Sequence, residues 1–320
     1  MRQELEQVRN EIEKVISGKR EAIGKILTAL LSDGHILLDD VPGVGKTTLA
    51  LALSRTVGLP FQRVQFTPDV LPSDLVGFSV PDKAGEPFVY HPGALHQAGL
   101  LLADEINRAS GKTQSALLEA MEERQVTVDG TTYPLSEPFL VIATQNSVDA
   151  AGVQRLPFAQ MDRFLIRLSL GYPDYEAQMA MLRNRQGQNP LDQVRPVLRR
   201  ETLLEMQREA RQLTVADTVL DYITRLTMAS REQEWIKVGI SPRGALFLCR
   251  AARAKAWTEG RDYVTGADVR EVFPDVCGHR VLLREEAAAE GKTVREALDR
   301  LLVTVESPDR RHGLAGLMKR

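Results

Sequence analysis

Hydrophobic and polar positions divide the chain into two regions. In the first, short continuous apolar runs alternate with stretches of helical period, a pattern typical of buried parallel strands joined by helices. The strands that this pattern predicts cover Ile36–Leu38, Phe61–Phe66, Leu100–Ala103 and Phe139–Thr144. From Pro173 onward helical periods dominate, and no strong strand is expected. The chain is therefore predicted to hold an α/β domain with a parallel sheet over residues 1–171 and a smaller, all-helical domain over 172–320.

A glycine-rich stretch lies between the strand Ile36–Leu38 and a predicted helix. Glycines let backbone N–H groups approach phosphate oxygens, and the start of a helix adds free N–H groups and a positive dipole end. Lys46 is expected to reach the β- and γ-phosphates of ATP, and the Thr47 hydroxyl to ligate Mg²⁺. The usual pattern opens with glycine where Asp40 stands, but aspartate tolerates turn conformations, so we expect the loop to form. The predicted nucleotide-binding residues are Pro42, Gly43, Val44, Gly45, Lys46, Thr47 and Thr48.

Two adjacent carboxylates, Asp104 and Glu105, end the apolar run that begins at Leu100. Successive strand residues point to opposite sides, so the pair can divide the work. Asp104 is predicted to hold Mg²⁺ through water, and Glu105 to polarise the water that attacks the γ-phosphate. An Asp-Glu pair alone is common in proteins. This pair is a candidate catalytic site because it follows a phosphate loop and ends an apolar strand. Asn146, after the next buried strand, is either the amide that orients this water or an ordinary polar residue at a strand end.

Three further positions carry open alternatives. Arg163 is either an arginine finger that reaches a neighbouring subunit's γ-phosphate or the partner of Asp162 or another acid, with Arg108 as the second choice for a finger. Arg243 begins a helix of the second region, where it is either a solvated charge or a phosphate sensor in a lid. The link Val15–Ile16 either packs on the adenine ring or forms an interhelix turn.

Two stretches read as inserted elements. The Pro/Gly/Asp-punctuated stretch from Thr67 to Gly99 is too long for a structureless loop and contains a predicted hairpin. A second hairpin is predicted around the Asp129-Gly130 turn signal.

Composition narrows the class of protein. A formal net charge of −2 over 320 residues gives no basic field of the kind that attracts nucleic acid. Two distant cysteines cannot form a disulfide framework, which fits a reducing, cytoplasmic setting. The charged N-terminus lacks the apolar stretch of a secretion signal, and no apolar run is long enough to span a membrane.

Together these motifs resemble the AAA+ ATPases, and most closely the MoxR family, over nearly the whole chain. An acidic residue before Val-Pro-Gly is familiar in that family, which accounts for Asp40. The chain departs from the family pattern over Ser147–Pro157, where many members carry an acidic, Thr-Tyr-containing loop. The segments that carry the resemblance are Asp39–Thr47, Leu102–Ala109, Ala143–Asn146 and Ala159–Phe164.

The resemblance implies a helix-2 insert at about 67–95, a hairpin before sensor 1 at about 124–136, sensor 1 at Asn146, the finger at Arg163 and sensor 2 at Arg243. It also implies a homo-oligomeric ring of six subunits, a partner with a von Willebrand factor A domain, and chaperone-like remodelling or maturation of a protein client driven by ATP and Mg²⁺. One alternative is a nucleic-acid motor, which the balanced charge of the first hairpin (Pro81–Glu86) disfavours. Another is a nucleotide-gated scaffold with little turnover, which Glu105 and Asn146 disfavour.

Overall fold

The computed structural model describes residues 2–81, 88–146, 156–184 and 189–309. Its centre is a five-stranded parallel sheet with the strand order β2-β5-β8-β1-β9. The strands are β1 (Ile36–Asp40), β2 (Phe61–Gln65), β5 (Leu100–Asp104), β8 (Leu140–Asn146) and β9 (Ile166–Leu168). All four strands predicted from apolar runs are therefore present, and they form one sheet.

The central strands are buried on both faces, which explains their continuous apolar runs. Alternate residues point to opposite faces, so Ile36 and Leu38 enter one buried cluster and Leu37 enters the other. The first cluster continues from the sheet through α1 and α2 into the C-terminal helices, while the second lies under α5. The helices of this region are α1 (Gln3–Glu13), α2 (Arg20–Leu31), α3 (Lys46–Thr56), α5 (Gly111–Glu123), α6 (Phe158–Met161) and the 3₁₀ turn η1 (Ile106–Arg108).

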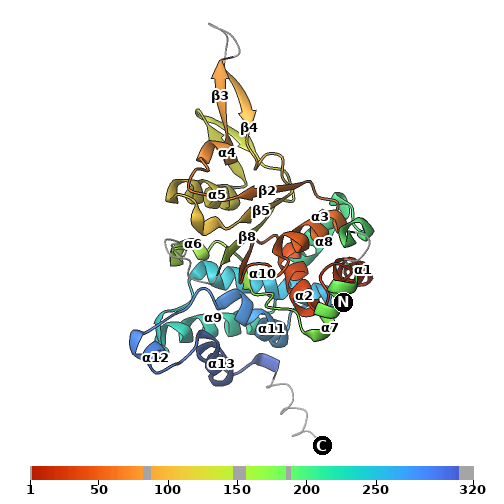
Figure 1. The fold of residues 1–320 in the computed structure, drawn as a ribbon. Helices are drawn as coiled ribbons and strands as arrows, with labels where there is room; N and C mark the ends of the chain where they lie inside the picture. Colours follow the sequence, from red (N-terminus) through yellow and green to blue (C-terminus); the bar gives the residue numbers. More distant parts are fainter. Residues whose placement is uncertain (1, 82–87, 147–155, 185–188, 310–320) are drawn as a thin grey trace, which may run out of the picture.

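Two antiparallel hairpins stand out from the sheet, as predicted (Figure 1). Asp129 and Gly130 both have positive φ, at 50° and 78°, as a tight two-residue hairpin turn requires. Tyr90 of one hairpin stacks on Tyr133 of the other, with ring centroids 4.0 Å apart. The elements are α4 (Pro72–Val76), β3 (Gly77–Pro81) and β4 (Phe88–Pro92) in the first insert, and β6 (Gln125–Val128) and β7 (Thr131–Pro134) in the second.

The C-terminal region is helical, as predicted, and several of its helices begin at a side-chain cap. Ser241, Thr265 and Thr293 each accept a hydrogen bond from the backbone N–H three residues on. The helices are α7 (Tyr175–Asn184), α8 (Arg200–Gln212), α9 (Asp217–Glu232), α10 (Pro242–Thr258), α11 (Gly266–Cys277), α12 (Glu285–Ala289), α13 (Val294–Thr304) and the 3₁₀ turn η2 (Pro190–Gln193).

One detail of this region was not predicted. A short antiparallel pair, β10 (Ile236–Val238) with β11 (Leu282–Leu283), joins segments on either side of α10 and α11, so the region is helical but not purely so. Two- and three-residue strands carry too little alternation to be found in the sequence. The predicted family departure at Ser147–Pro157 lies mostly outside the described residues. Within the described ranges, no helix is long and apolar enough to cross a membrane.

Candidate functional site

The carboxyl ends of three neighbouring strands bring Lys46, Glu105 and Asn146 together. The parallel register pairs Asp40 with Asn146 and Ala103 with Ala143, so β1, β8 and β5 end side by side. In open α/β sheets this edge is the usual ligand site. We call it the carboxyl edge.

The glycine-rich loop has the backbone conformation that a phosphate cradle needs. Gly43 and Gly45 have φ values of 83° and 92°, a region that side chains disfavour. A Cβ at Gly43 would meet nothing within 4 Å, so the loop surface is open there. Lys46 begins α3, and Thr47 and Thr48 follow half-buried in the same first turn. The loop therefore offers open backbone and a helix start to an anion.

Lys46 is buried, and its ammonium is held by neutral oxygens. Nζ donates to the carbonyl oxygens of Asp40 and Val41, at 3.1 and 3.3 Å, and to Oδ1 of Asn146 at 3.1 Å. Burial lowers the pKa of Lys46, while the carboxylates of Asp40, Asp104 and Glu105 act in the opposite direction. The lysine is thus fixed between the loop and the sensor strand.

Asp40 stands where the usual motif has glycine, and the structure gives a different reason for it than turn tolerance. It is the last residue of β1, in extended backbone, and only 3% exposed. Its Oδ2 accepts hydrogen bonds from the backbone N–H groups of Leu170 and Gly171, the latter at 2.9 Å, and its Oδ1 accepts from Val41 N at 2.9 Å. The carboxylate therefore ties the start of the loop to the segment that follows β9.

The acidic pair and the sensor amide form one network. Thr144 Oγ1 donates to Asp104 Oδ1 at 2.6 Å and accepts from Glu105 N at 2.9 Å. Asn146 Nδ2 donates to Glu105 Oε1 at 2.9 Å, so Asn146 bridges Lys46 and Glu105. Glu105 has φ 56° and ψ 47°, an uncommon conformation for a residue with a side chain, of a kind that gathers at active sites.

Three neighbours of the acidic pair complete the carboxyl edge. Gln65, at the end of β2, donates to Glu105 Oε2 at 3.0 Å, and Arg108 binds the same oxygen at 2.9 Å. Arg63 pairs with Asp104 Oδ2 at 2.8 Å. The sequence motifs pointed to neither Gln65 nor Arg63. Both lie in the predicted strand Phe61–Phe66, and Gln65 is the last residue of β2. Arg108, the second choice for a finger, lies beside its own subunit's glutamate.

The link that contains Val15 and Ile16, predicted as either an adenine contact or an interhelix turn, packs on the phosphate loop. Ile16 is buried, and its Cδ1 would lie 3.1 Å from a Cβ placed on Gly45, so it packs directly on the phosphate loop. Val15 and Val44 are half-buried and pack against the same cluster. These contacts place the α1–α2 link against the phosphate loop.

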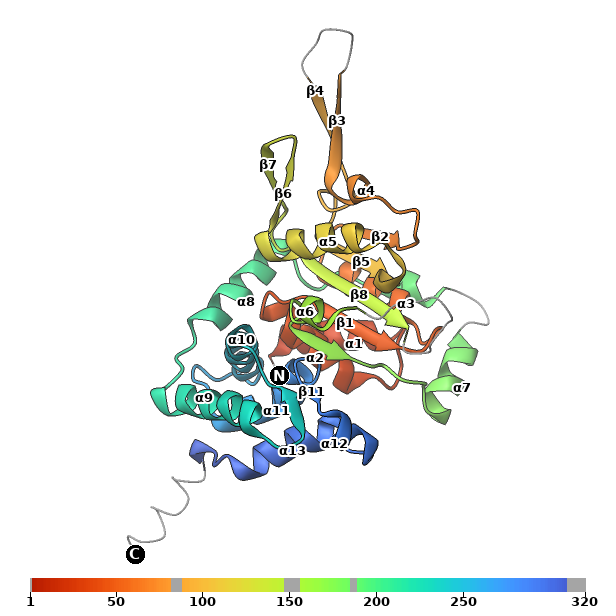
Figure 2. The same cartoon turned by 90° about the vertical axis from the view of Figure 1, so that its left-hand side faces the viewer.

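Arg163 and Arg243 lie at the other end of the sheet. Arg163 precedes β9, whose first residue pairs with Ile36, the first residue of β1. Both arginines bind Glu122, in the last turn of α5: Arg163 Nε at 3.1 Å from Oε2, and Arg243 through Oε1. A strand rises about 3.3 Å per residue, so the five-residue β1 alone separates the two edges by roughly 15 Å. In Figure 2, α6 and α10 lie toward the amino end of β8, away from its arrowhead.

A cavity of about 460 Å³ opens at this second end, which we call the amino edge. Its charged lining is dominated by arginines and also includes Asp33 and Glu122. Asp162, which sequence analysis named as a partner for Arg163, binds Arg280 instead, at 2.7 Å. The arginines of the lining are Arg124, Arg163, Arg243, Arg250 and Arg253.

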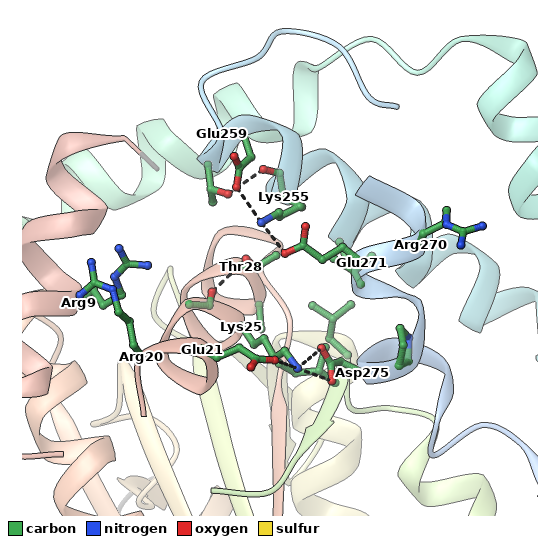
Figure 3. A pocket seen from close by; sticks show the side chains of 18 of the residues that line it. Arg9, Arg20, Glu21, Lys25, Thr28, Lys255, Glu259, Arg270, Glu271 and Asp275 are labelled. Atoms are coloured by element: carbon green, nitrogen blue, oxygen red, sulfur yellow. Dashed lines mark hydrogen bonds and ion pairs between the residues drawn. The ribbon is translucent and has the colours of Figure 1, made fainter. Parts of the chain in front are cut away.

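Another cavity, of about 620 Å³, lies between α2 and the helices α10 and α11 (Figure 3). Several of its charged side chains pair with one another. Lys25 binds Glu21 and Asp275 at 2.9 and 3.1 Å, and Lys255 likewise binds two glutamates. The Lys25–Asp275 ion pair joins α2 of the first region to α11 of the C-terminal region. None of the predicted site residues lines the cavity.

Comparison with known proteins agrees with this geometry. Residues 35–166 match the model of the ATPase family associated with various cellular activities (AAA), and residues 228–301 match the AAA lid domain. Chaperone MoxR1 of Mycobacterium tuberculosis is 41% identical over 95% of this chain and 82% of its own. The uncharacterised protein YeaC of Bacillus subtilis is 42% identical over 94% of this chain and 93% of its own. A crystal structure of a proposed ATPase from Cytophaga hutchinsonii superposes with a TM-score of 0.86, at 39% identity, covering 95% of this chain and 94% of that one.

The parallel sheet, the phosphate loop and the helical lid define a AAA+ domain. Within that class, the chain belongs to the MoxR family of AAA+ ATPases.

Proposed function

We propose that this chain hydrolyses ATP between the subunits of a homo-oligomeric ring, and uses that hydrolysis for chaperone-like remodelling or maturation of a protein client. The observation that carries the proposal is the division of the catalytic groups. Lys46, Glu105 and Asn146 meet at the carboxyl edge, whereas Arg163 and Arg243 lie at the amino edge. An arginine side chain cannot span the sheet, so both arginines are suited to act on a neighbour's nucleotide.

The residues of the carboxyl edge fit a magnesium–triphosphate. The open cradle at Gly43, the buried Lys46 and the start of α3 would hold the phosphates, and Thr47 with Asp104 would hold the metal. Mg²⁺ bound there would neutralise charge on the β- and γ-phosphate oxygens. Glu105 takes the proton of the attacking water, and Asn146, which already donates to Glu105, fixes the orientation of that carboxylate. Pro42, Val44 and Thr48 would shape the rest of the loop, and the packing of Ile16 on Gly45 supports Val15 and Ile16 as the adenine contact.

The ring we propose has six subunits, with residues 1–171 as core and 172–320 as lid. In such a ring Arg163 would serve as the finger and Arg243 as sensor 2, both in trans. The free thiols of Cys249 and Cys277 support a cytoplasmic setting. A von Willebrand factor A domain partner remains part of the proposal through the family resemblance.

A protein client is favoured over nucleic acid by the surface of the first hairpin. Phe88 is 71% exposed and Phe78 49% exposed, beside exposed Val80 and Val89. Apolar side chains gathered on a projecting element are typical of protein-binding surfaces. A protein that moves along nucleic acid needs basic side chains along the path of the phosphates, whereas these exposed hairpin side chains are apolar.

The test is the Glu105→Gln variant. We expect it to bind ATP with nearly unchanged affinity and to release phosphate at least about 100-fold more slowly, because no base accepts the proton of the attacking water. Glu119→Gln, on the exposed side of α5, is the matched control and should keep wild-type turnover. Wild-type specific activity should also rise with protein concentration as subunits assemble. Unchanged phosphate release by Glu105→Gln would refute the mechanism, and turnover independent of concentration would refute the shared site.

A further inference from the structure

An ion pair between a buried arginine and a half-buried aspartate lies in the turn next to Arg163. Arg280, three residues after α11, is 1% exposed, and its Nε donates to Asp162 Oδ1 at 2.7 Å. The same guanidinium donates to the carbonyl oxygens of Asp162 and Leu165, at 2.9 and 3.1 Å, and also to that of Phe164. Arg280 therefore binds Asp162, Phe164 and Leu165, the residues around Arg163.

The second oxygen of Asp162 reaches the helix that carries Arg243. Ser241 Oγ donates to Asp162 Oδ2 at 3.0 Å, and it caps α10 by accepting from Gly244 N at 3.0 Å. Packing on this side is tight, since a Cβ on Gly244 would come within 2.8 Å of Arg280 Cδ. One carboxylate thus joins the turn at Arg163 to the first turn of α10.

An ion pair that buries a charge contributes little net stability relative to apolar side chains, because the buried charge loses its water. Arg280 is 1% exposed and Asp162 20% exposed. Asp162 directly precedes Arg163 in the chain. Burial lowers the pKa of Arg280, and the charge of the nearby Arg243 lowers it further. What the pair supplies is a fixed spacing between two segments that are remote in sequence.

We propose that Arg280 is a positioning residue for the finger. Through Asp162 and Ser241 it holds Arg163 and Arg243 as one unit, at the spacing needed to meet a single phosphate group on the neighbouring subunit. The inference rests on the proposed function of the two arginines. Lysine cannot replace Arg280, because an ammonium lacks the planar fork that reaches a carboxylate and several carbonyl oxygens together.

The experiment uses Arg280→Lys in the full chain. We expect kcat to fall about tenfold or more while the ATP affinity stays within about twofold, because the subunit's own cradle is untouched. Arg261→Lys is the matched control: it alters another half-buried arginine–aspartate pair, Arg261–Asp268, which does not touch Asp162. It should leave kcat unchanged.

Mixed rings separate positioning from general damage. Glu105→Gln subunits cannot hydrolyse ATP but present an intact arginine pair, whereas Arg280→Lys subunits keep an intact Glu105. Random one-to-one mixing should restore about a quarter of wild-type turnover per subunit, since one junction in four combines a good site with a good finger. If Arg280→Lys unfolds like the wild type but its mixtures with Glu105→Gln are not rescued, the inference is overturned. A wild-type kcat in Arg280→Lys alone would also overturn it.

Two further variants keep the test decisive. Arg163→Ala mixed with Glu105→Gln must also be rescued; if it is not, the trans finger itself is wrong, and the fault lies with the proposed function rather than with Arg280. If Arg280→Lys does not fold, Ser241→Ala replaces it, with Thr293→Ala, which removes the equivalent cap of α13, as its control. A several-fold lower kcat in Ser241→Ala but not in Thr293→Ala supports the inference, and equal kcat values in the two overturn it.

Discussion

The two edges of the central sheet differ in sign of charge and in construction. At the carboxyl edge, Asp104 and Glu105 lie beside one buried lysine, and each residue belongs to a short contiguous motif. At the amino edge, two arginines share Glu122, and the Arg243–Glu122 contact joins positions 121 apart in sequence. The proposed shared site divides its work along this difference: one edge would hold the triphosphate and the base, and the other would supply cations to a neighbouring subunit.

Of the variants below, we expect Arg163→Ala to lower turnover most. A finger in trans is worth about 10³–10⁵ in rate, so we expect turnover to fall about 1,000-fold with ATP binding retained. Steady-state phosphate release and nucleotide titration measure the two effects. Arg300→Ala, which removes an exposed ion pair with Glu234, is the control and should change neither. Normal turnover in Arg163→Ala would leave the amino edge without a catalytic role.

Asp40 tests whether the carboxyl edge also has a structural acid. Because its carboxylate accepts from Leu170 and Gly171, Asp40→Asn should lower the free energy of unfolding by about 2 kcal/mol, a typical value for hydrogen bonds to a charged group. Denaturant unfolding measures the loss, and Asp39→Asn removes the neighbouring charge as a control. Equal stability of Asp40→Asn and wild type would contradict the assigned role.

Gln65 is expected to help hold the Glu105 carboxylate in place. Gln65→Ala removes a hydrogen bond to Glu105 Oε2 and leaves Asn146 as the amide on that carboxylate, so kcat should fall by roughly 3- to 10-fold. Gln62→Ala, near the start of the same strand and bonded to Gln97, is the matched control. A kcat that falls equally in both variants would indicate damage to β2 rather than a specific contact.

His35, which lines the cavity at the amino edge, should make the stability of the fold depend on pH, and this is the smallest of the predicted effects. Burial, assisted by the charge of Arg124, holds the pKa of His35 well below 6.5, and both ring nitrogens are engaged, with Val141 N and the Met121 carbonyl oxygen at 3.0 Å each. The unfolded chain therefore binds more protons below pH 6.5. The stabilisation is complete above that pH and falls as the pH decreases, by at most about 1.4 kcal/mol per pH unit.

Urea unfolding at pH 7.5 and 5.5 measures this slope. Burial also lowers the pKa of His279, so His35→Gln should reduce the slope without abolishing it. A slope unchanged in His35→Gln would exclude His35 as the titrating group.

Much of the carboxyl edge was predictable from the sequence. Continuous apolar runs identify buried parallel strands, and the carboxyl ends of such strands meet at one edge. Gly43–Thr47, Asp104 and Asn146 each follow such a strand, so the order of residues alone was enough to expect that they meet. The Asp129-Gly130 hairpin was predictable for a similar reason, because its turn is specified by two adjacent residues.

The amino edge was decided by tertiary packing. The sequence shows that Arg163 and Arg243 exist, but not that Glu122 lies between them or that Arg280 is buried behind Asp162. Nor does it show that the Asp40 carboxylate binds the backbone of Leu170 and Gly171, since turn tolerance is all that the local pattern suggests for Asp40. A local motif is readable because neighbouring residues fix their own geometry. Contacts between segments more than 100 positions apart depend on how helices pack, and no single segment encodes that packing.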